Sequence, residues 1–93
     1  MDSRDLVAWN MRRLRVERKL SQERLATLAG VDRTYVSRLE RSLENPSIGI
    51  LDKVALVLDV SIADLFLEPS PEDNRPRPLK AGRKANSDAP QDV

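Results

Sequence analysis

The chain has 93 residues, and its 16 Lys and Arg residues against 15 Asp and Glu residues leave a formal net charge of +1. Neither cysteine nor histidine is present, which excludes disulfides, cysteine-based zinc sites and the usual catalytic base. No apolar run approaches the ~20 residues that a membrane-spanning helix needs. We therefore expect one small cytoplasmic domain with no cofactor, no metal, no catalytic residues and no membrane contact. An enzyme built on carboxylate pairs such as Asp2 and Asp5 is the weakest alternative.

The first predicted helix spans residues 5–19. Its apolar residues recur at i, i+4 and i+7 as a buried stripe of Val7, Met11 and Leu14. Arg15 lies beside this stripe, where a full charge needs a partner, and Glu40 is the candidate partner. Such an ion pair would set the angle between two helices. The alternative is that both side chains reach solvent.

Residues 21–41 predict two short helices joined by a tight turn. Gly30 can adopt φ > 0 at the turn, and Ser21 and Asp32 are suited to N-cap the two helices. The positions that face inward are Leu25, Ala26, Ala29, Val36 and Leu39. Such a helix-turn-helix corner can place its second helix in the major groove of DNA. An ordinary helical hairpin with a solvated polar face is the alternative.

The second of these helices, residues 32–41, carries polar side chains on the face that points away from the core. The base-reading candidates on it are Arg33, Thr34, Tyr35, Ser37 and Arg38. Arg33 and Arg38 can each pair with O6 and N7 of guanine, and Thr34 and Ser37 can contact a thymine methyl group or a base edge.

Positive charge is concentrated around this corner. Residues 12–41 hold nine basic and four acidic side chains, whereas residues 42–68 hold one basic and five acidic side chains. A basic region on one side of a nearly neutral domain is typical of a surface that binds phosphates.

After the corner, Pro46 indicates a loop, Ser47 is a plausible N-cap, and residues 48–59 predict a fourth helix. A capping-box sequence at 61–64 opens a short fifth helix that ends near residue 67. These two helices carry more apolar residues than one core needs. The surplus residues that we assign to a dimer interface are Ile50, Val54, Val57, Phe66 and Leu67. A generously packed single core is the alternative.

From residue 69 the composition changes. Five of the six prolines lie between residues 69 and 90, and apolar residues are scarce. We predict an ordered domain at 1–68 and a disordered tail at 69–93. The tail can act as an arm that inserts Arg75 and Arg77 into a minor groove, or it can be a solvated segment.

The segment 22–41 resembles the helix-turn-helix of the phage repressor and Cro family, the Xre-like regulators. The residues that carry this resemblance are Ala26, Gly30, Val36, Leu39 and Glu40. The flanks RRLRVERKLSQERLA and NPSIGILDKVALVLDVSIADLF agree, so the resemblance covers about residues 6–67. VDRTYVSRLER also resembles the recognition helix of the small controller proteins of restriction–modification systems.

The resemblance implies an all-α, five-helix fold of the lambda-repressor type. It also implies a homodimer that regulates transcription from a palindromic or near-palindromic operator in double-stranded DNA, with RNA polymerase as a further candidate partner. An antitoxin or protein-binding adaptor that uses the same domain is the alternative.

The family's functional residues carry over by position. Arg33, Thr34 and Arg38 match base-reading positions, and Arg15 and Glu40 match a buried ion pair. The candidates for phosphate contacts are Ser21, Gln22, Arg41, Asn45 and Ser47. Ser42 departs from the family, which usually has glycine there, so either Ser42 is strained at φ > 0 or the loop takes another path.

Overall fold

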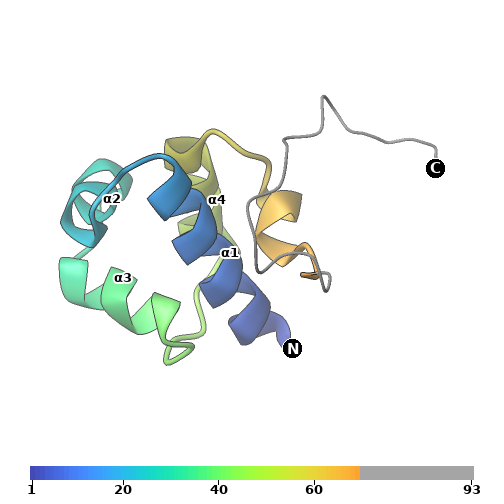
Figure 1. Cartoon of the computed structure of the whole chain (residues 1–93). Coiled ribbons are helices and arrows are strands. Elements are labelled where there is room, and N and C mark those ends of the chain that lie inside the picture. Colours follow the sequence, from blue (N-terminus) through green and yellow to red (C-terminus); the bar gives the residue numbers. More distant parts are fainter. Residues whose placement is uncertain (70–93) are drawn as a thin grey trace.

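The computed structural model describes residues 1–69. In that range the elements are α1 (Ser3–Glu17), α2 (Gln22–Ala29), α3 (Arg33–Glu40), α4 (Ile48–Leu58) and the 3₁₀-helix η1 (Ile62–Phe66). The helix α1 lies in the middle, with α3 packed on one side and η1 on the other (Figure 1). The predicted tail, including Arg75 and Arg77, lies outside the described residues apart from Pro69.

The predicted all-α class is confirmed, but the count of five α-helices is wrong by one. The last element is a five-residue 3₁₀-helix, because Asp64 donates its backbone N–H to Ser61 three residues earlier and Leu67 is already extended. The carboxylate of Asp64 accepts the backbone N–H of Ser61 at 3.0 Å, as the capping-box sequence predicts.

The helices begin at residues whose side chains accept free backbone N–H groups. The hydroxyl of Ser21 accepts the N–H of Arg24 at 2.9 Å, and that of Ser47 accepts the N–H of Ile50 at 3.1 Å, as predicted. Asp32 occupies the N-cap position of α3, but its side chain makes no such bond, so the predicted cap is wrong. Asp32 is exposed, and water can satisfy the first N–H groups of α3 in its place.

The helix α1 begins two residues before the predicted start, because Asp2 caps it by accepting the N–H of Asp5 at 2.9 Å. It also ends two residues before the predicted end, because Lys19 is left-handed with φ 59°.

All four α-helices end in the same way. The residue that leaves each helix has a positive φ; these residues are Lys19, Gly30, Ser42 and Asp59. The next residue then donates its N–H to a carbonyl five positions back, as in the bond of 2.9 Å from Leu43 to Arg38. Ser42 therefore adopts the left-handed conformation, with φ 62°, at a cost of about 1 kcal/mol relative to glycine.

One apolar core joins the four α-helices and η1. Its fully buried side chains include Met11 from α1, Leu25 from α2 and Leu39 from α3, together with Leu58 and Leu65 from the last two elements. A buried side chain cannot form a dimer interface. The assignment of Val54 to that interface is therefore wrong, because α4 directs Val54 into this core with no exposed area.

Asn10 is the buried polar residue of α1. Its Nδ2 lies 3.0 Å from the carbonyl oxygens of Leu6, Leu65 and Leu67, and its Oδ1 accepts a bond from Nη2 of Arg13 at 3.0 Å. These bonds attach η1 and the residue after it to α1. Nothing in the sequence indicates this role, because the carbonyls of Leu65 and Leu67 lie 55 and 57 residues away in the chain.

Candidate nucleic-acid interface

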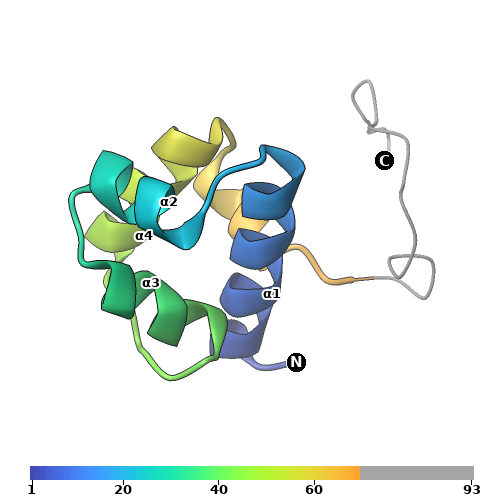
Figure 2. The ribbon, with the colours of Figure 1, turned by 60° about the vertical axis from the view of Figure 1, so that its left-hand side comes forward.

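The helices α2 and α3 form the predicted corner, and α1 lies beside them (Figure 2). Val36 and Leu39 direct the apolar face of α3 against α1 and α2. The opposite face carries the base-reading candidates. Arg33 and Thr34 are exposed, whereas Tyr35, Ser37 and Arg38 are half-buried. The corner therefore presents a polar helix face with arginines near both ends.

A buried ion pair holds α3 against α1. The Nε and Nη2 atoms of Arg15 donate to the two carboxylate oxygens of Glu40 at 2.7 and 3.0 Å, and Nη1 donates to the carbonyl of Leu20 at 2.7 Å. The side chains of Arg15 and Glu40 are only 12% and 2% exposed. Gln22 of α2 also donates to Glu40, at 3.0 Å. Glu40 thus connects three helices and sets the orientation of α3.

Arg38 makes a second ion pair, which the sequence analysis did not predict. Its Nε donates to the carboxylate of Glu44 at 2.6 Å, so an acidic side chain of the following loop lies beside the polar face of α3. Partial burial, and then the nearby negative charge of Glu44, raise the pKa of the Tyr35 hydroxyl above its usual value of 10. Glu44 is the one charged residue between positions 42 and 51, so no charge pattern in the sequence indicates this contact.

The candidates for phosphate contacts differ in their exposure and in the hydrogen bonds that they already make. Ser21 and Ser47 are exposed at the N-termini of α2 and α4, where their hydroxyl oxygens accept backbone N–H groups and their O–H groups can still donate. Arg41 and Asn45 are exposed. Gln22 already donates to Glu40, so its amide contributes to the position of α3 before it meets any ligand.

The predicted dimer residues are divided among three environments. Val54 is in the core, Ile50 and Val57 pack partly against the core, and Phe66 and Leu67 are exposed. Ile48, which is 71% exposed, is an apolar surface residue that the prediction missed.

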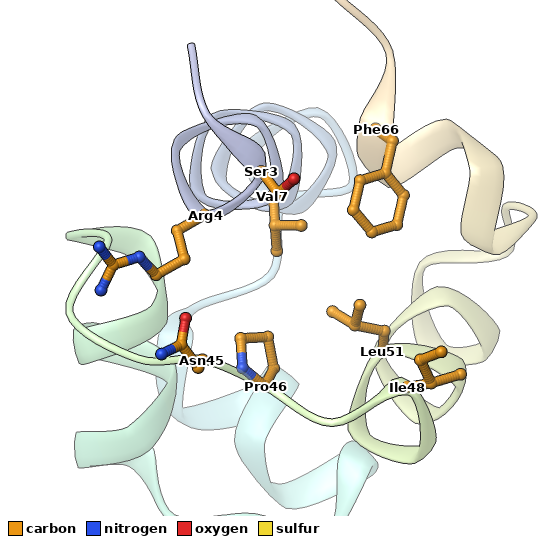
Figure 3. Close-up of a pocket in the computed structure, with 8 residues that line it drawn as sticks. All are labelled: Ser3, Arg4, Val7, Asn45, Pro46, Ile48, Leu51 and Phe66. Atoms are coloured by element: carbon orange, nitrogen blue, oxygen red, sulfur yellow. The ribbon is translucent and has the colours of Figure 1, made fainter.

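Ile48 and Phe66 line an open, mostly apolar cavity of about 220 Å³. Figure 3 shows Phe66 of η1 facing Val7 of α1, with Pro46 and Leu51 on the other side of the opening. Of the two dimer candidates that remain exposed, Phe66 borders this hollow between α1, α4 and η1, and Leu67 is not among the residues that line it.

Within residues 1–69, no helix is long and apolar enough to span a membrane, and no group of three or more His, Cys, Asp or Glu side chains is suited to hold a metal ion.

The fold and the exposed face of α3 define a helix-turn-helix domain. The family model described as "Helix-turn-helix" matches residues 11–65, and the chain belongs to this family. The relatives include Xre-type regulators and the restriction–modification controllers, as the resemblance predicted.

One similar protein is a hypothetical transcription factor of Neisseria meningitidis. It is 44% identical over 68 residues, which are 73% of this chain and 64% of the relative. Its crystal structure has a TM-score of 0.71, with 73% of this chain and 78% of that chain covered. This chain thus matches slightly less than two thirds of the full-length relative.

Two further structures are similar. The restriction–modification controller protein C.AhdI of Aeromonas hydrophila is 40% identical, with a TM-score of 0.66 and coverage of 68% of this chain and 96% of that chain. The biofilm regulator SinR, solved in complex with DNA, is 43% identical, with a TM-score of 0.61 and coverage of 63% and 95%. SinR of Bacillus subtilis is 42% identical over 64 residues, which are 68% of this chain and 58% of SinR.

Proposed function

We propose that this chain is a sequence-specific DNA-binding regulator of transcription. It acts as a dimer on a palindromic or near-palindromic operator, with residues 32–41 in the major groove. The observation that carries the proposal is the polar face of α3, which carries the exposed Arg33 and the half-buried Arg38 on a helix that a buried ion pair holds in place.

The charge distribution supports the same proposal. Nine basic residues lie between positions 12 and 41, and the exposed Arg41 and Asn45 follow the recognition helix. Phosphate contacts supply most of the affinity, whereas the base-reading side chains supply discrimination. The relative SinR was solved with DNA, which agrees with this assignment. A DNA-bound regulator of this kind acts in the cytoplasm.

Selection of bound sites from random double-stranded DNA, repeated at two salt concentrations, tests the proposal. A single enriched motif with two related halves is expected, together with a steep loss of affinity at the higher salt concentration. Recovery of random sequences at both salt concentrations would reject the proposal.

Arg33→Ala is expected to weaken binding to the selected duplex by ~1–3 kcal/mol and to relax the preference at one base pair in each half-site. The reason is that Arg33 loses its pair of hydrogen bonds to one guanine. Equilibrium titration of the selected duplex and single-base variants measures the effect. Arg12→Ala, which removes the same charge from an exposed position on α1, is the control. Equal weakening on selected and random DNA would contradict a base-reading role.

We place the dimer interface on three exposed apolar residues: Ile48 and Phe66, which line the cavity, and Leu67, which follows Phe66 in the chain. Ile48→Lys is expected to weaken self-association at least about tenfold, because a charge at the centre of an apolar interface must lose its water. Sedimentation equilibrium measures the change. Leu56→Lys is the matched control, since Leu56 is 81% exposed but lies outside this surface. A monomeric unaltered chain, or equal effects of the two variants, would count against this interface.

A protein partner is the second candidate function, because the relative SinR was also solved in complex with the SinI protein. An antitoxin or adaptor role predicts that a second protein co-purifies with the full chain from its host. RNA polymerase is a further candidate partner. Its recruitment to the selected operator is measured by comparing polymerase binding with and without this chain.

A further inference from the structure

The donor groups of Arg38 are shared unequally between the protein and solvent. Its Nε donates to Oε2 of Glu44 at 2.6 Å, and its Nη2 donates to the backbone carbonyl of Leu43 at 3.2 Å. A guanidinium group carries five N–H donors in a planar fork. Because Nε and Nη2 border the same side of this fork, the loop occupies one side edge. The far edge, formed by Nη1 and the second N–H of Nη2, is left for another partner.

The far edge has the geometry that guanine needs. Two parallel N–H groups at the end of an arginine match O6 and N7 of guanine in the major groove. The side chain of Arg38 is 43% exposed, so this edge can meet a base while Glu44 keeps its contact with Nε. A side chain that is already held in one orientation loses less rotamer freedom when it binds.

Glu44 also places a negative charge beside the arginines of α3. Its side chain is 29% exposed, it lies near Tyr35 of the recognition helix, and it directly precedes Asn45. A carboxylate at this position repels DNA phosphates and competes with them for Arg38. Random DNA offers Arg38 mostly phosphate oxygens, so it provides few base contacts that could offset that repulsion.

We propose that Glu44 is a specificity-determining residue that acts by positioning Arg38. Glu44 holds the side edge of Arg38, directs the far edge to one guanine, and prevents Arg38 from turning to phosphates or to neighbouring bases. This inference rests on the proposed function, because it requires α3 to lie in the major groove.

The test compares the full chain with Glu44→Gln on three duplexes: the selected site, the same site with the guanine under Arg38 replaced, and a random sequence. Fluorescence anisotropy gives each dissociation constant. The guanine under Arg38 is identified as the position of the site at which Arg38→Ala no longer prefers guanine over the other bases. Glu44→Gln is expected to lower the ratio of affinities between the first two duplexes about fivefold. It is also expected to tighten binding to the random duplex about threefold.

Asp52→Asn removes the same charge from an exposed position on α4 and should leave unchanged the ratio of affinities for the selected site and the guanine-replaced site. Glu44→Gln in the Arg38→Ala background should also leave this ratio unchanged, because the side chain that Glu44 positions is gone. Thermal unfolding of each variant checks that the domain remains folded.

Two results would overturn the inference. One is an unchanged ratio in Glu44→Gln, and the other is an equal fall of the ratio with and without Arg38. Either result leaves the proposed function intact, provided that the unaltered chain prefers the selected duplex over the random one. Absence of that preference in the unaltered chain rejects the proposed function itself.

Discussion

Arg15→Met is expected to lower the free energy of unfolding by about 3–5 kcal/mol. The methionine leaves the carboxylate of Glu40, which is 2% exposed, with only the amide of Gln22 as a hydrogen-bond partner. The carbonyl of Leu20 also loses its donor. Since small domains are stable by about 5–15 kcal/mol, this loss removes a large part of the total. Urea denaturation followed by circular dichroism measures it.

Two further variants distinguish a buried pair from a surface pair. Glu17→Gln breaks exposed contacts of 3.4 and 3.5 Å to Arg13 and Arg18, and we expect it to cost less than about 1 kcal/mol. The double variant Arg15→Met with Glu40→Leu removes both charges and should recover much of the stability. A loss of less than about 1 kcal/mol in Arg15→Met itself is incompatible with a pair that anchors α3.

Asn10→Leu is expected to destabilise the domain by about 2–4 kcal/mol, because leucine has a similar volume but donates no hydrogen bond. The carbonyl oxygens of Leu65 and Leu67 lose the Nδ2 donor, and Nη2 of Arg13 loses its acceptor. We also expect amide hydrogen exchange to become faster in η1 than in α2 and α3, since Asn10 attaches η1 to α1. Chemical denaturation and exchange measurements together test both effects.

The isosteric variant Asn10→Asp shows whether the donor matters. At neutral pH it places a carboxylate against the same carbonyl oxygens, so its cost should equal or exceed that of Asn10→Leu. Asn45→Asp makes the same chemical change at an exposed loop residue and should alter stability by less than about 0.5 kcal/mol. Similar stabilities of Asn10→Asp and the unaltered chain would show that these hydrogen bonds are unimportant.

Most local features of the fold were predictable from signals within a few residues of the chain; the exceptions are the cap bond expected of Asp32 and the two ends of α1. Gly30 adopts the left-handed conformation, and Ser21 and Ser47 cap their helices, because these contacts join near neighbours. The apolar spacing of α3 also placed Val36 and Leu39 in the core. Helix periodicity alone therefore indicated which face of α3 is exposed, and with it the candidate site.

The predicted dimer interface was wrong at Val54 because neighbouring elements compete for one side chain. Val54 and Ile50 both belong to apolar stripes of α4, and only the positions of α1, α2 and η1 decide that Val54 is fully buried. Glu44 was not assigned a role because a loop carboxylate in a sequence has no defined direction. In the structure, the left-handed Ser42 reverses the chain and brings Glu44 back to Arg38.

The sequence by itself determined the all-α class, the two-helix corner and its polar outer face, since each depends on helical period and on capping between near neighbours. It also predicts which residues of that face are candidates for reading bases. Only the tertiary structure decided how Asn10 joins α1 to η1 and how Glu44 restrains Arg38. It also showed which apolar residues of α4 and η1 remain at the surface. These features depend on distances between elements, and such distances follow from the packing of the whole core and the path of its loops.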